Sequence, residues 1–510
     1  MFKARAEISR KDMATSPSVP SFGAAAPYLA KLVIGGQDCD AASGATFERI
    51  GPATGMLATL ASAATADDVM RAADAAAAAF PAWSGSIPAF RRALLEKAAR
   101  LLAEREEQIT AIMMAETGAT QQWCRFNVRL GSQIFFDAAA MTTHVSGAIV
   151  PTDQPGVTAF AIRQPAGVCL AIAPWNAPII LGVRSIAIAL ACGNTVILKS
   201  SELSPATHRA MVDVLVDAGF PAGVVNLISN APADASAIVE ALIAHPVVRR
   251  INFTGSTRVG RIIAQIAARH LKRCLLELGG KAAFIVLDDA DLDEAVKAAA
   301  FGAFFNQGQI CMSAGRHLVH RSVAHAYAAK LTERARKLHV ADPNGGPCHL
   351  GPLINQRQTD RVHKIVSDTV AAGAQLLTGG THQGNLYQPT VLLDVKPEMP
   401  AFSLEIFGPV APITVFDTDE EAIALVNSSE YGLAAAIHTA SIPRALHIAE
   451  KIRTGMVHIN DQPVNCEPQV PFGGMGASGT GGRFGGPASV EQFTQAQWVS
   501  IAGVAAQYPF

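Results

Sequence analysis

Cys311 differs from the other seven cysteines because it lies in a loop-like segment, NQGQICMSAGR at 306–316, directly after a helical pattern. A catalytic thiol requires partial exposure and surroundings that favour the thiolate. A cysteine taken at random is more often a small buried hydrophobic side chain. The loop setting favours a nucleophile at Cys311 over that structural interpretation.

Glu277 lies inside an apolar strand-like segment, LLELGGK at 275–281. An ionised carboxylate there is costly unless it is paired or used. Burial raises the pKa of a carboxyl group, which is a standard way to obtain a general base near neutral pH. A salt bridge to Lys281 or Arg273 explains the residue equally well, so both interpretations stay open.

Asn176 lies between two prolines in APWNAP, 173–178, where an expected strand ends. A side-chain amide at this place can donate a hydrogen bond to a developing oxyanion, which contributes about 2.7–4 kcal/mol in comparable sites. Taken alone, an asparagine that turns the chain is the simpler interpretation. The oxyanion role therefore depends on Asn176 lying near a nucleophile.

Two further strand ends could hold a dinucleotide. FTGSTRVG at 253–260 opens a helix, so the backbone at Gly255 and Ser256 could bind a pyrophosphate. KSSE at 199–202 offers Lys199 and Glu202 to ribose hydroxyls. An acidic residue there disfavours a 2′-phosphate, which predicts NAD over NADP. No GxGxxG motif is present, and each segment alone is a weak signal.

The elements around these residues predict a doubly wound α/β fold. From about residue 166, short apolar runs at 168–175, 195–201, 224–229 and 249–256 alternate with helical patterns. Near-continuous apolar strands separated by helices indicate a parallel sheet covered on both faces, with its ligand at the carboxyl ends of the strands. A second α/β series follows Gly280, with strands at 282–287, 388–395, 411–416 and 455–460.

Helical patterns are predicted outside the first sheet and within the second series. Asp68 to Leu102 is expected to be helical, and Gly118 is a plausible helix end. Asp291 with Glu294 is typical of a helix start, and a long helix is expected near 323–338. The segments 143–165 and 494–501 are strand-like and stand apart from both series, so we expect them to pair with another subunit.

Composition excludes several classes of protein. The chain has 510 residues, 50% of them hydrophobic and 16% charged, with a net charge of −1. Such a chain has no basic field for nucleic acid or anionic lipid, and it is too apolar to be disordered. The most apolar stretch, 168–183, contains Pro174, Asn176 and Pro178, which argues against a membrane-spanning helix.

The cysteines and histidines show no metal-binding spacing. The eight cysteines are scattered without a CxxC motif, which predicts a reducing, cytoplasmic location and no metal. Residues 1–28 are predicted to form a flexible tail. They weakly resemble a transit peptide, but Glu7 and Asp12 count against it.

Together these segments closely resemble the aldehyde dehydrogenase superfamily, over nearly the whole chain from about residue 30. The matching motifs are ETGAT (116–120), PWN (174–176), GNTVILK (193–199), FPAGVVN (220–226), FTGS (253–256), LELGGK (276–281), NQGQIC (306–311), GPLIN (351–355), EIFGPV (405–410), YGLAAAI (431–437) and PFGG…SG (471–479). Two positions depart from the usual pattern: Ser200 stands where the family often has Pro, and Gly476 where it often has Lys.

The resemblance implies a role for each matching position. Cys311 would be the nucleophile, Glu277 the base that hydrolyses a thioester, and Asn176 the oxyanion donor together with the Cys311 backbone N–H. The implied NAD-binding positions are Trp175, Lys199, Glu202, Phe253, Gly255, Ser256, Leu278, Glu405 and Phe407. Of these, Glu405 and Phe407 would hold the nicotinamide half.

The resemblance also implies two doubly wound α/β domains plus a protruding β-strand oligomerisation segment. The expected NAD-binding domain comprises 29–142 and 166–278, and the catalytic domain 279–487. The expected oligomerisation strands lie in 143–165 and 488–510, in a homodimer or homotetramer.

The substrate is expected to be an aromatic aldehyde of the salicylaldehyde, benzaldehyde or vanillin type, because LELGGKAAFIVLDDADLDEAV, RFGG (483–486) and the C-terminal segment are most similar to aromatic aldehyde dehydrogenases. Ile310, Met312 and Arg184 are candidate substrate contacts, although Arg184 is more simply explained as paired on a helix surface. Aliphatic aldehyde or semialdehyde dehydrogenases, a CoA-acylating enzyme and a non-catalytic structural relative remain alternatives.

Overall fold

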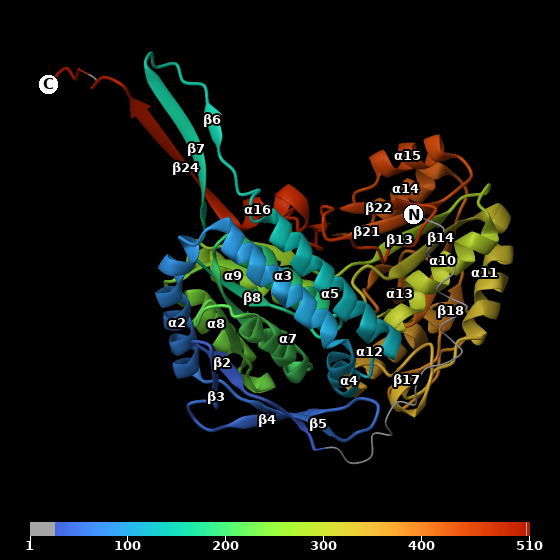
Figure 1. Ribbon diagram of the computed structural model, residues 1–510. Coiled ribbons are helices and arrows are strands. Elements are labelled where there is room, and N and C mark those ends of the chain that lie inside the picture. Colours follow the sequence, from blue (N-terminus) through green and yellow to red (C-terminus); the bar gives the residue numbers. More distant parts are fainter. Residues whose placement is uncertain (1–25, 506) are drawn as a thin grey trace.

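The computed structural model describes residues 26–505 and 507–510 and is built around two seven-stranded sheets (Figure 1). Residues 1–25 of the expected tail lie outside the described residues, and its last residue, Tyr28, already begins β1 (Tyr28–Ala30). The two doubly wound units predicted from the sequence are confirmed. The domain boundaries themselves stay a prediction.

The first sheet has five parallel strands, and two further strands extend it at one side through antiparallel pairing. Its spatial order is β12 (Arg273–Glu277), β11 (Val248–Thr254), β8 (Val168–Ile172), β9 (Thr195–Lys199), β10 (Val225–Ile228), β2 (Leu32–Ile34) and β3 (Gln37–Cys39). The observed strands are shorter than the apolar runs. For example, β8 ends before Pro174, and β9 ends at Lys199.

Helices cover both faces of this sheet, as alternation along each strand requires. Leu170 and Ile197 pack on one face with α2 (Ala66–Ser84), α8 (Ala235–Ala244) and α9 (Thr257–Arg269). Ala171 and Leu198 pack on the other face with α6 (Pro178–Ala191) and α7 (Pro205–Ala218), and α3 (Pro88–Glu104) and α5 (Gln121–Met141) form a further layer.

The second sheet is parallel except at one edge, where β15 is antiparallel to β18. Its order is β15 (Gln375–Thr378), β18 (Thr390–Leu393), β19 (Val410–Phe416), β14 (Ala314–His320), β13 (Ala282–Val286), β21 (Ala434–His438) and β22 (Met456–Ile459). One face packs against α10 (Leu292–Phe304) and α11 (Arg321–Arg336), and the other against α12 (Gln356–Ala371), α14 (Asp419–Asn427) and α15 (Ile442–Lys451).

The helical prediction for Asp68 to Leu102 is confirmed except at residues 85–87, which separate two helices. α2 ends at Ser84, and α3 begins with Pro88 at its first turn. Proline is favoured at a helix start but lacks the N–H that a helix interior needs, so periodic apolar residues on both sides do not imply one helix. The predicted end at Gly118 is confirmed: it terminates α4 (Glu106–Thr117) in the left-handed conformation, φ 66°.

Shorter elements complete the described chain. They are β4 (Thr46–Ile50) and β5 (Leu57–Ser62), which form a small sheet with β1, and η1 (Pro232–Asp234), η2 (Phe305–Gly308), η3 (Pro343–Gly345), β16 (His382–Gln383), β17 (Leu386–Tyr387), α13 (Pro400–Ser403), β20 (Tyr431–Gly432), β23 (Met475–Gly476) and α16 (Gly486–Phe493).

Three strands form an arm that projects from the body and carries the C-terminus (Figure 1). In this arm β24 (Thr494–Ala502) pairs antiparallel with β7 (Val157–Pro165), which also pairs with β6 (Ala148–Val150). The two separate strand-like segments of the sequence therefore pair with each other within one chain. Apolar side chains on the arm remain exposed, with Ile149 at 74% and Trp498 at 75%.

The two sheets meet with opposite ends of their strands. Trp175, Gly255 and Leu278 follow strands of the first sheet, whereas Cys311 and Phe407 precede strands of the second, and all five line one cavity. The carboxyl ends of the first sheet thus face the amino ends of the second. Chemistry contributed by both sheets can therefore meet in that cavity.

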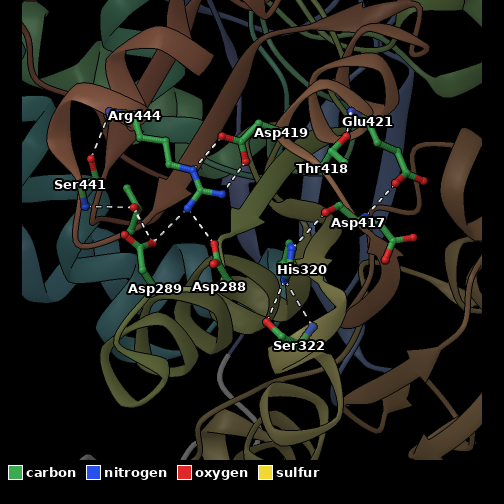
Figure 2. Close-up of polar contacts among 11 residues, drawn as sticks. Asp288, Asp289, His320, Ser322, Asp417, Thr418, Asp419, Glu421, Ser441 and Arg444 are labelled. Carbon is green, nitrogen blue, oxygen red and sulfur yellow. Dashed lines mark hydrogen bonds and ion pairs between the residues drawn. The ribbon is translucent and has the colours of Figure 1, made fainter.

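The opposite, carboxyl edge of the second sheet is closed by a polar network (Figure 2). Arg444 donates to Asp288 and to both carboxylate oxygens of Asp419, at 2.6–2.7 Å. His320 contacts the backbone oxygen of Asp417 at 3.1 Å. Because these groups satisfy one another, this edge does not repeat the ligand-binding arrangement of the first sheet.

Among the described residues, every helix is too short or too polar to cross a bilayer. Within the same ranges, 26–505 and 507–510, histidine, cysteine, aspartate and glutamate side chains form no group of three that could hold a metal ion.

Candidate active site

A cavity of about 590 Å³ lies where the two sheets meet. Its lining combines the thiol of Cys311, apolar side chains and several positively charged groups. Residues that line this cavity include Trp175, Asn176, Leu203, Gly255, Ser256, Leu278, Cys311, Gln358, Arg361, Glu405 and Phe407.

A tight loop places Cys311 at this cavity. Asn306 and Gln307 adopt left-handed backbone conformations, φ 48° and 57°, which non-glycine residues rarely take. Gly308 follows, also left-handed, and a Cβ there would collide with the backbone oxygen of Gly408. The loop is therefore held in a strained geometry by close packing against the second sheet.

The Cys311 thiol is protonated in this environment. Burial raises its pKa to about 12, with smaller contributions in the same direction from the negative charges of Glu405 and Glu277. Arg184 acts in the opposite sense. The thiolate that nucleophilic attack requires must therefore be produced by loss of the proton to a base or by added positive charge.

Asn176 is fastened to the loop that carries Cys311. Its side-chain Nδ2 donates to the backbone oxygen of Gln309 at 2.9 Å. Its own backbone oxygen accepts from Trp123 Nε1 at 2.9 Å and from Asn306 Nδ2 at 3.2 Å. An amide nitrogen has two hydrogens, so one remains for an oxyanion beside Cys311.

Glu277, the last residue of β12, is 3% exposed, and neither carboxylate oxygen has a hydrogen-bond partner among the described residues. Burial raises its pKa well above the usual range, against the opposing charges of Arg184 and Arg483. The salt bridge to Lys281 or Arg273 that the sequence left open does not form.

The PFGG segment fixes the space beside Glu277. A Cβ on Gly473 would lie 2.6 Å from Glu277 Oε1, so only glycine allows the carboxylate this close to the backbone. Arg483 donates to the backbone oxygens of Gly474 and Gly482, both at 2.9 Å, and thereby braces the same segment.

The other end of the cavity fits a dinucleotide. Ser256 caps α9 by accepting from Val259 N, and the start of that helix, Ser256 to Arg258, lines the cavity, where a helix start favours an anion. Neighbouring side chains require glycine here: the Phe253 ring packs on Gly255, and Leu278 packs on Gly260. Backbone left bare in this way can approach a pyrophosphate closely.

Glu405 and Phe407 lie on the catalytic side of the cavity. Glu405 Oε1 accepts from Gly280 N at 3.0 Å, and burial raises the pKa of this carboxyl group. The Phe407 ring meets Trp175 edge-on, with centroids 5.7 Å apart. Phe407 itself is left-handed, φ 57°, which turns its ring into the cavity wall.

Sequence reasoning missed the residues of α12 that support this loop. Arg361 donates to the backbone oxygen of Ile406 at 2.8 Å and to that of Glu405. Gln358 Nε2 donates to the backbone oxygens of Ile406 and Phe407 at 3.1 and 2.9 Å. The only signal was their position, directly after the GPLIN motif.

Several predicted residues do not line the cavity. Lys199 and Glu202 form an ion pair with each other, and their neighbour Leu203 takes the lining position. Phe253 is buried beneath Gly255. Ile310 and Met312 lie in the hydrophobic core, 5% and 7% exposed, rather than on the cavity wall.

Arg184 is not the surface arginine that seemed the simpler interpretation, since it is only 7% exposed. Its guanidinium lies 4.2 Å from the ring centroid of Phe472 and 5.9 Å from that of Phe484. It also contacts the Cys466 sulfur. A buried cation thus lies close enough to Cys311 and Glu277 to influence both charges.

The fold and the cavity define a class: a two-sheet α/β enzyme with a loop-borne thiol beside a dinucleotide-sized cavity. The chain belongs to the aldehyde dehydrogenase family, whose family model matches residues 39–499. Its cofactor is accordingly a nicotinamide dinucleotide, NAD or NADP.

Several known proteins are similar along nearly their whole length. A vanillin dehydrogenase of Pseudomonas sp. (strain HR199 / DSM 7063) is 52% identical, over 94% of this chain and 99% of that protein. A benzaldehyde dehydrogenase [NAD(+)] of Pseudomonas putida is 49% identical, over 92% and 96%. The crystal structure of a salicylaldehyde dehydrogenase from Pseudomonas putida G7, complexed with salicylaldehyde, has a TM-score of 0.93 at 42% identity, over 95% of this chain and 100% of that one.

Proposed function

We propose that this chain oxidises an aromatic aldehyde to its carboxylate with NAD, through a covalent intermediate on Cys311. The observation that carries the proposal is that the Cys311 thiol and the fastened amide of Asn176 line one cavity, while the buried, unpaired carboxylate of Glu277, next to the lining residue Leu278, lies close enough to Cys311 to influence its charge. The names of the similar proteins support the aromatic substrate.

Each residue has one chemical task in the proposed reaction. The Cys311 thiolate adds to the aldehyde carbon, and the free Asn176 amide hydrogen stabilises the oxyanion of the thiohemiacetal. A bound nicotinamide ring supplies the acceptor for the hydride that leaves this carbon. Glu277 then removes a proton from water, which attacks the resulting thioester and releases the carboxylate and the Cys311 thiolate.

The cofactor side supports NAD over NADP. Glu202 lies beside Lys199 at the carboxyl end of β9, near the Leu203 end of the cavity. A carboxylate accepts from ribose hydroxyls and repels a 2′-phosphate. Trp175, Gly255, Ser256, Leu278, Glu405 and Phe407 would bind the remainder of the dinucleotide, with Phe253 supporting it from beneath.

We assign Arg184 to the far side of Cys311, where it would meet a phenol or phenolate group of the substrate. The rings of Phe472 and Phe484 hold its guanidinium in place. In this proposal Ile310 and Met312 pack the loop and do not touch the substrate. A cytoplasmic location stays a prediction from the cysteine content.

A substrate panel tests the proposal. With NAD and no CoA, kcat/KM for benzaldehyde, vanillin and salicylaldehyde should exceed that for hexanal and succinic semialdehyde by at least about tenfold. A higher value for either of the last two would contradict the aromatic assignment. A requirement for CoA would contradict hydrolysis by Glu277, and absence of any NADH formation would indicate a non-catalytic relative.

Arg184→Ala should lower kcat/KM for salicylaldehyde more than kcat/KM for benzaldehyde. Equal losses for the two substrates would contradict the assigned phenol contact.

A further inference from the structure

Three polar residues meet at the ends of two adjacent strands, β9 and β10. Lys199 is the last residue of β9, and it is paired in register with Ile228, the last residue of β10. Glu202 and Asn230 follow these two strand ends. β8, which leads to Trp175, pairs with β9 on the other side, so the group lies beside the proposed adenosine end of the cavity.

One oxygen of Glu202 receives both available donors. Glu202 Oε1 accepts from Lys199 Nζ and from Asn230 Nδ2, the latter at 3.1 Å. No described residue donates to Oε2, and the Glu202 side chain is 21% exposed. The two donors therefore hold the carboxylate by one oxygen and leave the other available to a ligand.

The orientation of the Asn230 amide is fixed by its neighbours. Asn230 is fully buried, and its Nδ2 also donates to the backbone oxygen of Ala231 at 2.8 Å. Both groups facing Nδ2 are acceptors, so a flipped amide would set oxygen against oxygen.

The oxygen of the same side-chain amide, Asn230 Oδ1, has no hydrogen-bond partner among the described residues. A buried acceptor without a partner is unfavourable. The contribution of this side chain at its position is therefore donation from Nδ2, and Glu202 receives it.

We propose that Asn230 is a specificity-positioning residue, which locks the Glu202 carboxylate toward the adenosine ribose and thereby disfavours a 2′-phosphate. The inference rests on the proposed NAD preference and names a residue that controls it. With Asn230 in place, Glu202 stays on Lys199 and neutralises a cation that a 2′-phosphate would otherwise bind. Without Asn230, only Lys199 holds the flexible glutamate, so the carboxylate can turn away and expose that cation.

Equilibrium binding of NADH and NADPH to the full-length protein, followed by their fluorescence, tests this role. Asn230→Ala should raise the Kd for NADH a few-fold and lower the Kd for NADPH. The ratio of the Kd for NADPH to the Kd for NADH should therefore fall about tenfold. Should the alanine variant fail to fold, Asn230→Ser serves instead, because a serine hydroxyl is too short to reach Oε1. An equal loss of affinity for both nucleotides, with the ratio unchanged, would mean a purely structural role and overturn the inference.

A second variant separates this inference from the proposed function. Glu202→Gln should lower the ratio whether or not Asn230 matters, and an unchanged ratio would refute the proposed position of the adenosine ribose. In the Glu202→Gln background, adding Asn230→Ala should change the ratio little, because the carboxylate that Asn230 positions is gone. A full additional tenfold change there would show that Asn230 acts independently of Glu202 and would overturn the inference.

Discussion

At the scale of single residues, the site depends on two acidic groups whose pKa values burial raises. The pKa of Glu277 is raised well above its usual range, and that of Cys311 to about 12. The raised pKa values oppose the ionised forms that the base and the nucleophile need. The buried cation Arg184 favours both ionised forms.

Glu277 should make stability depend on pH. Its pKa is raised in the folded state, so the folded protein binds the proton more tightly than the unfolded chain, and stability is lost as pH rises above the unfolded value near 4.5. Glu277→Gln removes this loss. We expect its melting temperature to exceed that of the parent by about 1–3 °C at pH 8 and by less at pH 5.

Glu48→Gln is the matched control, since Glu48 is exposed on β4 and outside the site. Its melting temperature should follow the parent at both pH values. If the gain in melting temperature of Glu277→Gln is equal at pH 5 and pH 8, the raised pKa of the Glu277 carboxyl is contradicted.

Sequence reasoning identified Glu277 but could not choose between a base and a salt bridge. The choice depends on which side chains the fold brings to the carboxylate, and those come from residue 184 and from 473–483, far along the chain. Similarly, apolar neighbours of Cys311 do not reveal whether they face the substrate or the core. Ile310 and Met312 face the core.

At the scale of elements, α12 supports the loop that carries Glu405 and Phe407. Arg361 and Gln358 donate to the backbone oxygens of 405–407. Helix α12 therefore supports the catalytic side of the cavity through one of its faces. The helical pattern after GPLIN does not reveal this, because backbone oxygens of a distant loop leave no trace in side-chain spacing.

Arg361→Met should loosen that loop without unfolding the helix. We expect the Kd for NADH to rise about tenfold, as expected for loss of two charge-assisted hydrogen bonds. Lys364→Met is the control, because Lys364 lies on the same helix and pairs with Asp368 at the surface. Equal affinities of the two variants would contradict the support role of Arg361.

At the scale of the whole molecule, the arm of β6, β7 and β24 presents apolar side chains to solvent. Ile149, Trp498 and Ile501 are 74%, 75% and 55% exposed. The sequence predicted strands that pair with another subunit, but β24 and β7 pair with each other, because the fold brings together segments more than three hundred residues apart in the chain. A projecting sheet with exposed apolar groups favours contact with another copy of the chain.

We expect a dimer or tetramer whose assembly needs the arm. Ile149→Asp combined with Trp498→Asp should lower the molar mass measured by light scattering toward a smaller species. Ile87→Asp, which charges an exposed apolar residue between α2 and α3, should leave the mass unchanged. An unchanged mass in the arm variant would place the subunit contacts elsewhere.

The central claim is that Cys311 carries the acyl group and Glu277 releases it. The most direct test is to mix Glu277→Gln with benzaldehyde and NAD, quench in acid, and map the modified peptide by mass spectrometry. The account predicts one equivalent of NADH released in a burst and one benzoyl group on Cys311, with neither in Cys311→Ser. NADH release without acylation of Cys311, or turnover that survives in Cys311→Ser, would contradict it.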